Sequence, residues 1–450
     1  MEALKKELMT SVDHAWWRME SPANHMMIGS VLIFEDRLDL DRFIEVLQTR
    51  LVAKFNRFRQ RIVHENGFDF WQDDPYFAIE NHVISTGFPH DGGRRELQSL
   101  ASRLMSMGLE SNQPLWSINV IGHYGKGSAL IIRIHHCIAD GMSLMQLIIS
   151  LTDDCRDPGE VELCTGKPTR GARVHHDSLR DLITHPGQWL TALEHGLSGA
   201  EELAAVTLQA ADPKTALKGH LSGHKVVAWS EPFPLADVKR LGKCVHATVN
   251  DILMATAAGV IRNELLRHGE VVDDLNLHVA VPFNLRPLDQ PVDKLGNQFG
   301  LVVVPLPVGI ADPVLRLQAV KASIERLKQS YQAQAFFFLL EALGSAPSVL
   351  EQTALDILSR KASLVMTNVP GTRHAIYLAG AKVSQALAWV PQSGDIGVGL
   401  SILTYNDEVH FGFIADKALI SDPNRVTADF EQEFRLLESR LQEPGEETGD

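Results

Sequence analysis

The chain has 450 residues, of which 45% are hydrophobic and 22% charged. This length exceeds one ordinary hydrophobic core and predicts two domains or two lobes, while the composition excludes a disordered chain. The formal net charge of −14 argues against a protein that binds nucleic acid through clustered Lys and Arg. It does not exclude a membrane surface, because local patches can dock a protein that is acidic overall.

The cysteines and the N-terminal segment favour a reducing compartment. Four cysteines without a CxxC pair predict neither a zinc site nor a disulfide scaffold: Cys137, Cys155, Cys164 and Cys244. The first residues lack the apolar core of a signal peptide, and no apolar run approaches the about 18 residues of a membrane-spanning helix. We therefore expect a cytoplasmic protein that does not span a membrane.

The first half of the chain predicts strands that alternate with helices. Met26–Glu35 has the pattern of a buried strand, and "LDLDRFIEVLQTRLVAKF" follows with apolar residues about four apart, as in an amphipathic helix. Further on, "WSINVIGH" and "SALIIRIHH" flank the turn "YGKG", which predicts a hairpin, and "MSLMQLIISL" has helical spacing. His135 and His136 are therefore expected where a strand ends, before a loop and a helix.

The second half continues this alternation after a polar segment. No periodicity is visible from Cys155 to about Val174, which indicates a linker or loop, and a helix is expected at Gln188–Leu208. Thr248 is placed to cap a helix in which Asp251 favours the first turn, and "DPVLRLQAVKASIERLK" has Asp at the cap and Pro at the first helical position. "LNLHVAVPFN" and "FGLVVVPLPV" read as strands, and "LSILTYNDEVHFGFIAD" as a hairpin.

These elements predict mixed α/β sheets in two lobes. The hairpins imply antiparallel pairs, which argues against a doubly wound nucleotide-binding fold. We expect an N-terminal lobe at residues 1–154, a linker or crossover with a helix at 155–215 and a C-terminal lobe at 216–450.

The segment "HHCIADG" allows three interpretations. His135 and His136 can be ordinary residues that are hydrogen bonded at a strand end. A metal site is disfavoured, because successive strand residues point to opposite faces and no HExxH or cysteine cluster is present. The third interpretation is general-base catalysis: one imidazole faces a cavity and accepts a proton from a hydroxyl, Asp140 holds the loop by pairing with an arginine, and Gly141 lets the backbone turn tightly.

This segment resembles the HHxxxDG motif of the coenzyme A-dependent acyltransferase superfamily, which includes chloramphenicol acetyltransferase, carnitine acyltransferases and peptide-synthetase condensation domains. Other segments resemble, in order and over nearly the whole chain, bacterial wax ester synthase/diacylglycerol acyltransferases. They are "SVDHAWWRMESPANHMMIGSVLIFE", "QPLW", "VND", "VPFNLR", "GNQFG" and "TNVPG". "TNVPGT" departs from the more usual Ser-Asn-Val-Pro-Gly-Pro, and "NHMMIG" replaces a Pro-Met-His segment. The resemblance implies two lobes like those of chloramphenicol acetyltransferase, with the active site in a channel between them.

The resemblance also implies roles for the motif. His136 matches the family's base, which deprotonates the acceptor hydroxyl and then protonates the coenzyme A sulfur. His135 would support the strand end, and Asp140 would orient the loop by pairing with a cation. Arg286 of the other lobe is the preferred partner of Asp140, with Arg133 as the local alternative.

Other matching segments have a structural and a chemical interpretation. Asn250 and Asp251 either cap a helix or help to hold an oxyanion, and both interpretations stay open. Packing is the main role expected of "PLW", and "NVPG" has the composition of a turn. The candidates for lining a substrate channel are Pro114, Leu115, Trp116, Asn368, Pro370 and Gly371.

The resemblance implies an O-acyltransferase that moves a long-chain acyl group from acyl-coenzyme A to a fatty alcohol, giving a wax ester, or to diacylglycerol, giving triacylglycerol. Acyl-coenzyme A is then a co-substrate, and no cofactor, metal or acyl-enzyme is implied. A condensation-type or polyketide-associated acyltransferase and a catalytically inactive lipid-binding relative stay as alternatives. The expected location is the cytoplasm, with peripheral association with the inner membrane face or with lipid inclusions left open.

Overall fold

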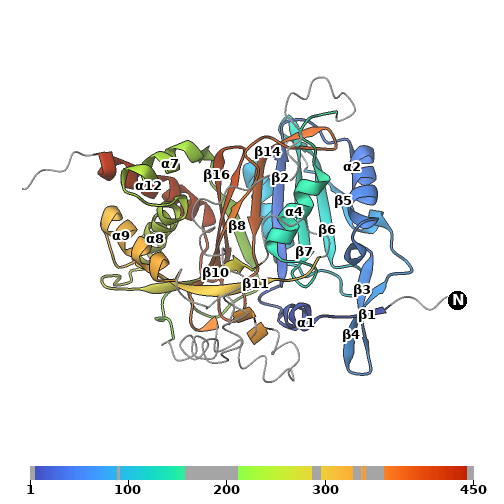
Figure 1. Ribbon diagram of the computed structural model, residues 1–450, viewed down its shortest axis with the longest axis horizontal. Coiled ribbons are helices and arrows are strands. Elements are labelled where there is room, and N and C mark those ends of the chain that lie inside the picture. The colour runs from blue at the N-terminus through green and yellow to red at the C-terminus, as the bar shows by residue number, and fades with distance from the viewer. Residues whose placement is uncertain are drawn as a thin grey trace, which may run out of the picture.

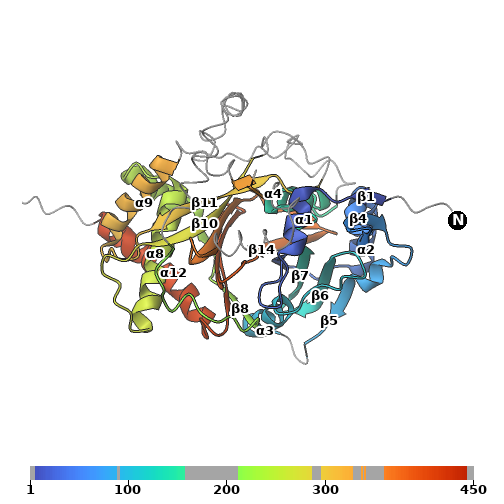
Figure 2. The ribbon, with the colours of Figure 1, turned by 90° about the horizontal axis from the view of Figure 1, so that it is seen from below.

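The computed structural model describes residues 6–88, 92–157, 211–285, 295–327, 336–337, 339–340 and 359–442. Two mixed β-sheets lie side by side in the middle of the molecule, and helices cover them from both sides (Figure 1). The same two halves are seen from below in Figure 2. The predicted two-lobed, mixed α/β fold is confirmed.

The first sheet has six strands, of which β2 and β7 are central. The antiparallel pairing of Met27 with His135 and of Ile28 with Ile134 joins these two strands. The predicted hairpin is β6–β7, which turns at Tyr124 and Gly127. In spatial order the strands are β13 (Tyr377–Leu378), β14 (Ala381–Trp389), β2 (Met27–Phe34), β7 (Gly127–His135), β6 (Trp116–Tyr124) and β5 (Val83–Thr86).

The second sheet contains parallel and antiparallel pairs. Its hairpin β15–β16 turns at Asn406 and Asp407, both with positive φ, as predicted. In spatial order the strands are β11 (Phe299–Leu306), β10 (Leu277–Asn284), β12 (Leu364–Pro370), β15 (Val398–Tyr405), β16 (Glu408–Asp416) and β8 (Lys225–Trp229), and β9 (Phe233–Pro234) also pairs with β16. A small third sheet has the order β1 (Lys6–Leu8), β4 (Phe68–Asp73) and β3 (Gln60–Glu65).

Two helices of the first lobe begin at side-chain caps that were not predicted from the sequence. Asp140 caps one of them through Ser143 N, and Thr10 caps another through Asp13 N. The helix expected after β2 is α-helical only to Val46 and then continues as π-helical turns. These elements are α1 (Ser11–Arg18), α2 (Leu40–Val46), η1 (Leu47–Val52), η2 (Asn56–Phe58), η3 (Ile79–Asn81), α3 (Arg94–Met105) and α4 (Gly141–Leu151).

The helices of the second lobe pack around α8, which is buried on nearly all sides. Thr248 and Asp251 form a capping box at its start, as the sequence indicated, and Asp312 accepts from the N–H groups of Val314 and Leu315 at the start of α9. These helices are α7 (Leu235–Cys244), α8 (Val249–Arg267), α9 (Pro313–Leu327) and α12 (Pro423–Gln442).

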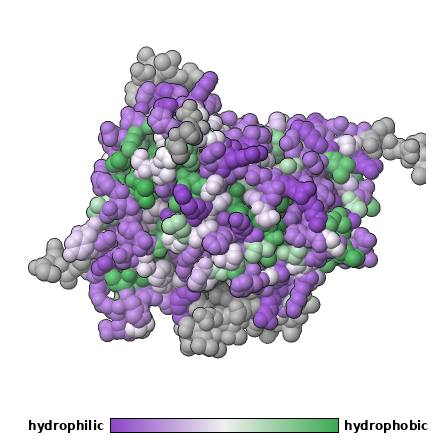
Figure 3. All heavy atoms as spheres, turned by 180° about the vertical axis from the view of Figure 1, so that it is seen from behind, coloured by the Kyte–Doolittle hydropathy of each residue, from purple (hydrophilic) through white to green (hydrophobic). Residues whose placement is uncertain are grey.

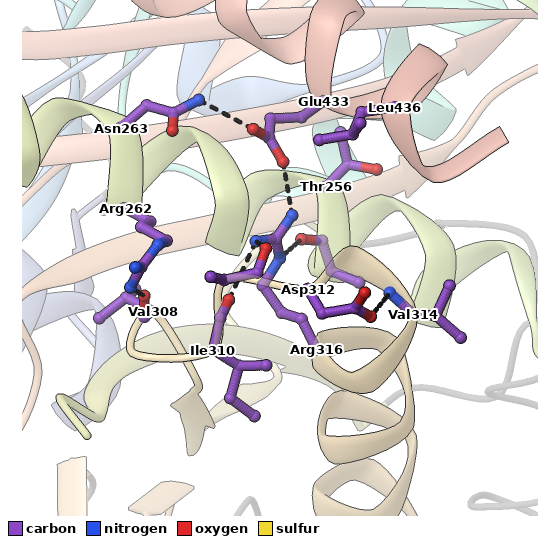
Figure 4. A network of polar contacts seen from close by, with 12 residues as sticks. Thr256, Arg262, Asn263, Val308, Ile310, Asp312, Val314, Arg316, Glu433 and Leu436 are labelled. Atoms are coloured by element: carbon purple, nitrogen blue, oxygen red, sulfur yellow. Dashed lines mark hydrogen bonds and ion pairs between the residues drawn. The ribbon is translucent and has the colours of Figure 1, made fainter. Parts of the chain in front are cut away.

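A buried ion pair ties α8, α9 and α12 together (Figure 4). The Arg316 guanidinium donates to Glu433 and to the backbone oxygens of Ala255 and Ile310. Asn263 donates to the other oxygen of Glu433 at 2.9 Å. A Cβ at Gly259 would lie 2.1 Å from that carboxylate, so only glycine lets α8 pass this close.

The sheets do not follow the predicted division of the chain completely. β13 and β14 come from the segment assigned to the C-terminal lobe, yet β14 pairs with β2 of the first sheet, for example Ala386 with Leu32. The linker expected at 155–215, and the helix within it, lie almost entirely outside the described residues. The boundaries themselves stay a prediction.

Polar contacts also join the two halves. Lys225 Nζ, at the start of β8, donates to Asn24 Oδ1 at 2.6 Å. The Asn24 amide donates in turn to the carbonyl oxygens of Gly394 and Ile396. Such buried bonds between distant segments hold one lobe against the other.

The surface shown in Figure 3 is mainly hydrophilic, with apolar side chains in scattered groups. In the described part of the chain, no single helix is long and apolar enough to cross a bilayer; α7 and α8 meet that test only together, with a bend of 98°. Cys137 and Cys244 are free, whereas Cys155 is disulfide-bonded. That bond was not expected, because the sequence showed no CxxC spacing.

Candidate active site

His136 lies where the two lobes meet. Its backbone N–H donates to the carbonyl oxygen of Met26, the residue before β2, at 2.7 Å, and it follows directly on the end of β7. Its ring stacks on Trp16 of α1, with centroids 4.1 Å apart and an angle of 19° between the planes. Phe299 of β11 covers the ring from the second lobe, with the two ring centroids 5.2 Å apart. The ring is therefore buried between elements of both lobes and not inside one of them.

The surroundings of His136 keep its ring neutral. Burial lowers the pKa of His136 to about 4, and the nearby carboxylate of Asp140 opposes this shift only in part. Nδ1 lies 3.0 Å from Oδ1 of Asn297. Among the residues that the structure describes, none forms a hydrogen bond with Nε2. A neutral imidazole with one occupied nitrogen and one unoccupied nitrogen can accept a proton.

His135 faces the other way, as strand alternation predicts. Its Nδ1 accepts a hydrogen bond from the Cys137 N–H at 3.1 Å, and its ring meets Trp17 edge-on at 5.5 Å. Its Nε2 lies 3.4 Å from Glu20 Oε2, within ion-pair distance but without hydrogen-bond alignment. These contacts all come from the first lobe, so only His136 reaches the junction.

Glu20 is the anion behind His135. Burial alone would raise its pKa, but contacts with His135 and His25 and the backbone N–H of Met26 lower the pKa to about 2. The carboxylate is therefore charged, and it joins the turn before β2 to the histidine pair.

Asp140 holds the loop by accepting hydrogen bonds from backbone N–H groups. Its Oδ1 accepts from Ser143 N at 2.8 Å and from the Ser143 hydroxyl at 2.7 Å, while its Oδ2 accepts from Gln298 N of the other lobe at 3.0 Å. The alternative pairing with Arg133 is wrong: Arg133 lies on the opposite face of β7 and donates to Ser117 and to the carbonyl oxygens at the end of α3. Arg286, the preferred partner, lies outside the described residues.

Gly141 does not make the tight turn that was expected. It is the first residue of α4, its φ is not positive, and a Cβ there would meet no described atom within 4 Å. Asp140 starts the helix by capping it, so no left-handed residue is needed.

The structure brings Asn250 and Asn368 together. The Asn368 amide at the end of β12 donates to Asn250 Oδ1 at 3.1 Å. Asp251 caps α8 through Oδ2, which accepts from Thr248 N, while its buried Oδ1 has no hydrogen-bond partner in the described ranges. No hydrogen bond joins any of these side chains to His136, so their role as an oxyanion site stays a prediction.

The "PLW" segment packs against the end of β7. The carbonyl oxygen of Leu115 accepts from His135 N at 3.0 Å. Trp116 is buried, donates to Phe58 O at 2.8 Å and stacks on His82 with centroids 4.5 Å apart. Pro114 precedes this packed pair. The geometry is that of a support for the histidine pair, and a channel through it stays a prediction.

The turn expected at "NVPG" is wrong. β12 runs from Leu364 to Pro370 and pairs in parallel with β15 up to Thr404, because the apolar run before Asn368 continues the strand. Gly371 N then donates to Thr404 O at 2.7 Å, and a Cβ on Gly371 would lie 2.5 Å from that oxygen. The glycine permits this close approach.

Four residues of the site were not predicted as such: Asp13, Trp16, Asn297 and Phe299. They surround the ring of His136 or lie directly behind its hydrogen bond. Their segments, "SVDHAWW" and "GNQFG", carried the family resemblance but had no chemical role assigned. No group of three or more His, Cys, Asp or Glu residues with metal-site geometry occurs in the described part of the chain.

Comparisons with known proteins identify the family. The family model described as the wax ester synthase/diacylglycerol acyltransferase catalytic domain matches residues 9–253, and the one described as the WS/DGAT C-terminal domain matches residues 295–438. A probable diacylglycerol O-acyltransferase of Mycobacterium tuberculosis is 28% identical over 448 residues, which cover 95% of each chain.

Solved structures show the same fold. A wax ester synthase/diacylglycerol acyltransferase from Marinobacter aquaeolei superposes with a TM-score of 0.69 at 21% identity, covering 97% of this chain and 100% of that one. The first condensation domain of the calcium-dependent antibiotic synthetase gives a TM-score of 0.64 at 15% identity, covering 98% of this chain and 97% of that domain. Because the two family models together match most of the sequence, the chain belongs to the wax ester synthase/diacylglycerol acyltransferase family of acyltransferases.

Proposed function

We propose that this enzyme transfers a long-chain acyl group from acyl-coenzyme A to the hydroxyl of an alcohol. Diacylglycerol is the first acceptor to test, since the similar mycobacterial proteins are named diacylglycerol O-acyltransferases, and a long-chain fatty alcohol is the second. The observation that carries the proposal is His136: a neutral imidazole between the lobes whose Nδ1 is hydrogen bonded to Asn297 and whose Nε2 forms no hydrogen bond with any described residue.

The proposed reaction needs one base and no covalent enzyme intermediate. Nε2 of His136 takes the proton of the acceptor hydroxyl, and the oxygen attacks the thioester carbonyl carbon. The carbon–sulfur bond then breaks, and the same proton passes from Nε2 to the departing coenzyme A sulfur. The products are an ester and free coenzyme A, and the imidazole is neutral again.

Cys137 does not compete with His136 as a nucleophile. It is fully buried, and burial raises the pKa of its thiol well above the usual value. A reactive cysteine needs the thiolate form and access to substrate, and this thiol has neither. Direct transfer between two bound substrates is therefore the mechanism that fits the chain.

The proposal is tested with purified protein, palmitoyl-coenzyme A, and either dioleoylglycerol or hexadecanol. Free coenzyme A and the ester product are measured in quenched samples. His136→Ala is expected to lower the rate by about 10²- to 10⁴-fold, the usual contribution of a general base. The matched control is His410→Ala. Burial also lowers the pKa of His410 to about 4, but this histidine lies in β16 and not in the motif.

Each outcome separates the alternatives. A wild-type protein that binds both substrates without releasing coenzyme A would instead be an inactive lipid-binding relative. Ester formation that persists in His136→Ala would show that another group is the base. Release of coenzyme A only when the acceptor is an amine bound to a carrier domain would favour the condensation-type alternative.

We also propose that the enzyme works at a lipid surface, because both acceptors are held in membranes or lipid inclusions. Exposed apolar side chains lie on or near the small sheet, where Leu8, Phe68 and Tyr76 are 56%, 58% and 83% exposed. Co-flotation with vesicles that contain dioleoylglycerol tests this location, and protein that stays entirely in the dense fraction would contradict it.

A further inference from the structure

We propose that Asn297 is a positioning residue that keeps the proton of the His136 ring on Nδ1 and thereby leaves the lone pair of Nε2 for the reaction. This inference deepens the proposed function and depends on it for its catalytic meaning. It assigns a role to "GNQFG", a segment that had none.

The orientation of the Asn297 amide follows from its neighbours. One side of the amide lies 2.8 Å from the carbonyl oxygen of His136 and 2.8 Å from Oδ1 of Asp13. A backbone carbonyl oxygen is always an acceptor, so the group that faces it must be the NH₂. The amide oxygen is then on the other side.

That amide oxygen lies 3.0 Å from Nδ1 of His136. An amide oxygen can only accept, so Nδ1 must carry the hydrogen. In a neutral ring Nε2 is then the unprotonated nitrogen. Because burial lowers the pKa of His136, the neutral ring with this one tautomer is the resting form.

The neighbouring histidine provides an internal comparison. Nδ1 of His135 accepts from the Cys137 N–H at 3.1 Å, so the hydrogen of a neutral His135 ring must be on Nε2. The two adjacent rings therefore have opposite tautomers, and only His136 offers an Nε2 lone pair.

The hydrogen bonds of Asn297 with His136 and Asp13 also fix the orientation of the His136 ring. Asn297 precedes β11 of the second lobe, whereas Asp13 lies on α1 and His136 follows β7 of the first. Asn297 and Asp13 are 6% and 3% exposed, so water competes little for these hydrogen bonds. A partner that orients an imidazole and sets its tautomer commonly changes activity or affinity by about 10- to 100-fold when it is removed.

The variant that tests this role is Asn297→Leu, which has a similar shape but no acceptor for Nδ1. The expected result is a kcat about 10- to 100-fold lower, with the KM for acyl-coenzyme A nearly unchanged. The control is Asn24→Leu, which also removes a buried amide that bridges the lobes but does not touch His136. A kcat that falls equally in both variants would indicate general loss of structure and would overturn the proposal.

A second measurement does not depend on activity. Nitrogen-15 NMR of histidine-labelled enzyme reports which ring nitrogen is protonated, and the His136 signals are those absent from His136→Gln. Wild-type enzyme should show a protonated Nδ1 and an unprotonated Nε2. In Asn297→Leu we expect a mixture of the two tautomers, because Nδ1 loses the side-chain acceptor that Asn297 provides.

The two measurements separate the inference from the proposed function. Wild-type His136 with its proton on Nε2 would overturn the inference, even if Asn297→Leu does not fold. Full kcat in Asn297→Leu would overturn it as well. Wild-type enzyme that shows the expected tautomer but transfers no acyl group to any alcohol would refute the proposed function and leave the Asn297 geometry intact.

Discussion

The pH dependence of kcat/KM is a direct test of His136 as the base. The pKa of its ring is lowered from 6.5 to about 4 because the ring is buried. The difference of about 2.5 units corresponds to about 3 kcal/mol in favour of the neutral ring. The base must be neutral, so activity is lost as the pH falls through the pKa of the folded enzyme. We expect kcat/KM to be nearly constant between pH 6 and 8 and to fall with a midpoint well below 6.5.

The assay measures coenzyme A in quenched samples by chromatography, so that detection does not vary with pH. Circular dichroism at each pH shows that the enzyme is still folded. kcat/KM reports the free enzyme, which is the state of the structure. The partner experiment is Phe299→Ala, which uncovers one side of the ring; admitted water should move the midpoint up towards 6.5. A wild-type midpoint near 6.5 would refute the reasoning, because it would mean that the base is solvated.

Three further predictions concern residues around the site and in the core. Asp140→Asn should lower the free energy of unfolding by about 1–3 kcal/mol and reduce kcat. The new NH₂ would face a backbone N–H group that now donates a hydrogen bond to the carboxylate. An unchanged Tm would contradict this prediction. Glu433→Gln should cost about 3–5 kcal/mol in chemical denaturation, because it removes the carboxylate that pairs with the buried Arg316 guanidinium. Glu35→Gln, in a surface pair, should cost less than about 1 kcal/mol, and equal losses would refute the comparison. Cys137→Ala should keep most of the ester-forming rate, and its complete loss would point to an acyl-enzyme.

Local signals in the sequence predicted much of the fold. Continuous apolar runs located β2 and β7, and the capping residues Thr248 and Asp312 located the starts of α8 and α9. The π-helical turns after Val46 were not predictable, because Leu47–Val52 keeps the apolar spacing of an ordinary helix. The pairing of β14 with β2 was not predictable for another reason: pairing between residues more than 340 positions apart leaves no local signal.

Only the part of the candidate site whose residues are close together in the sequence was predicted. The motif placed His135 and His136 at a strand end, and strand alternation separated their directions. Asn297 is 161 residues from His136 in sequence, so its hydrogen bond is a product of the lobes packing together. Arg133 was a plausible partner of Asp140 by proximity in sequence, but the two lie on opposite faces of β7 and its loop.

The pairing of β14, which comes late in the chain, with β2 of the first sheet has a consequence for folding during synthesis. Until residues near 389 have left the ribosome, β2 has neighbours on one side only, and its other edge offers unpaired N–H and C=O groups. A fragment that stops before Ala381 would carry that edge permanently and should associate with other chains. Splitting the gene at the lobe boundary is therefore a poor way to obtain the first half, whereas co-expression of the two pieces would let the late strand complete the early sheet.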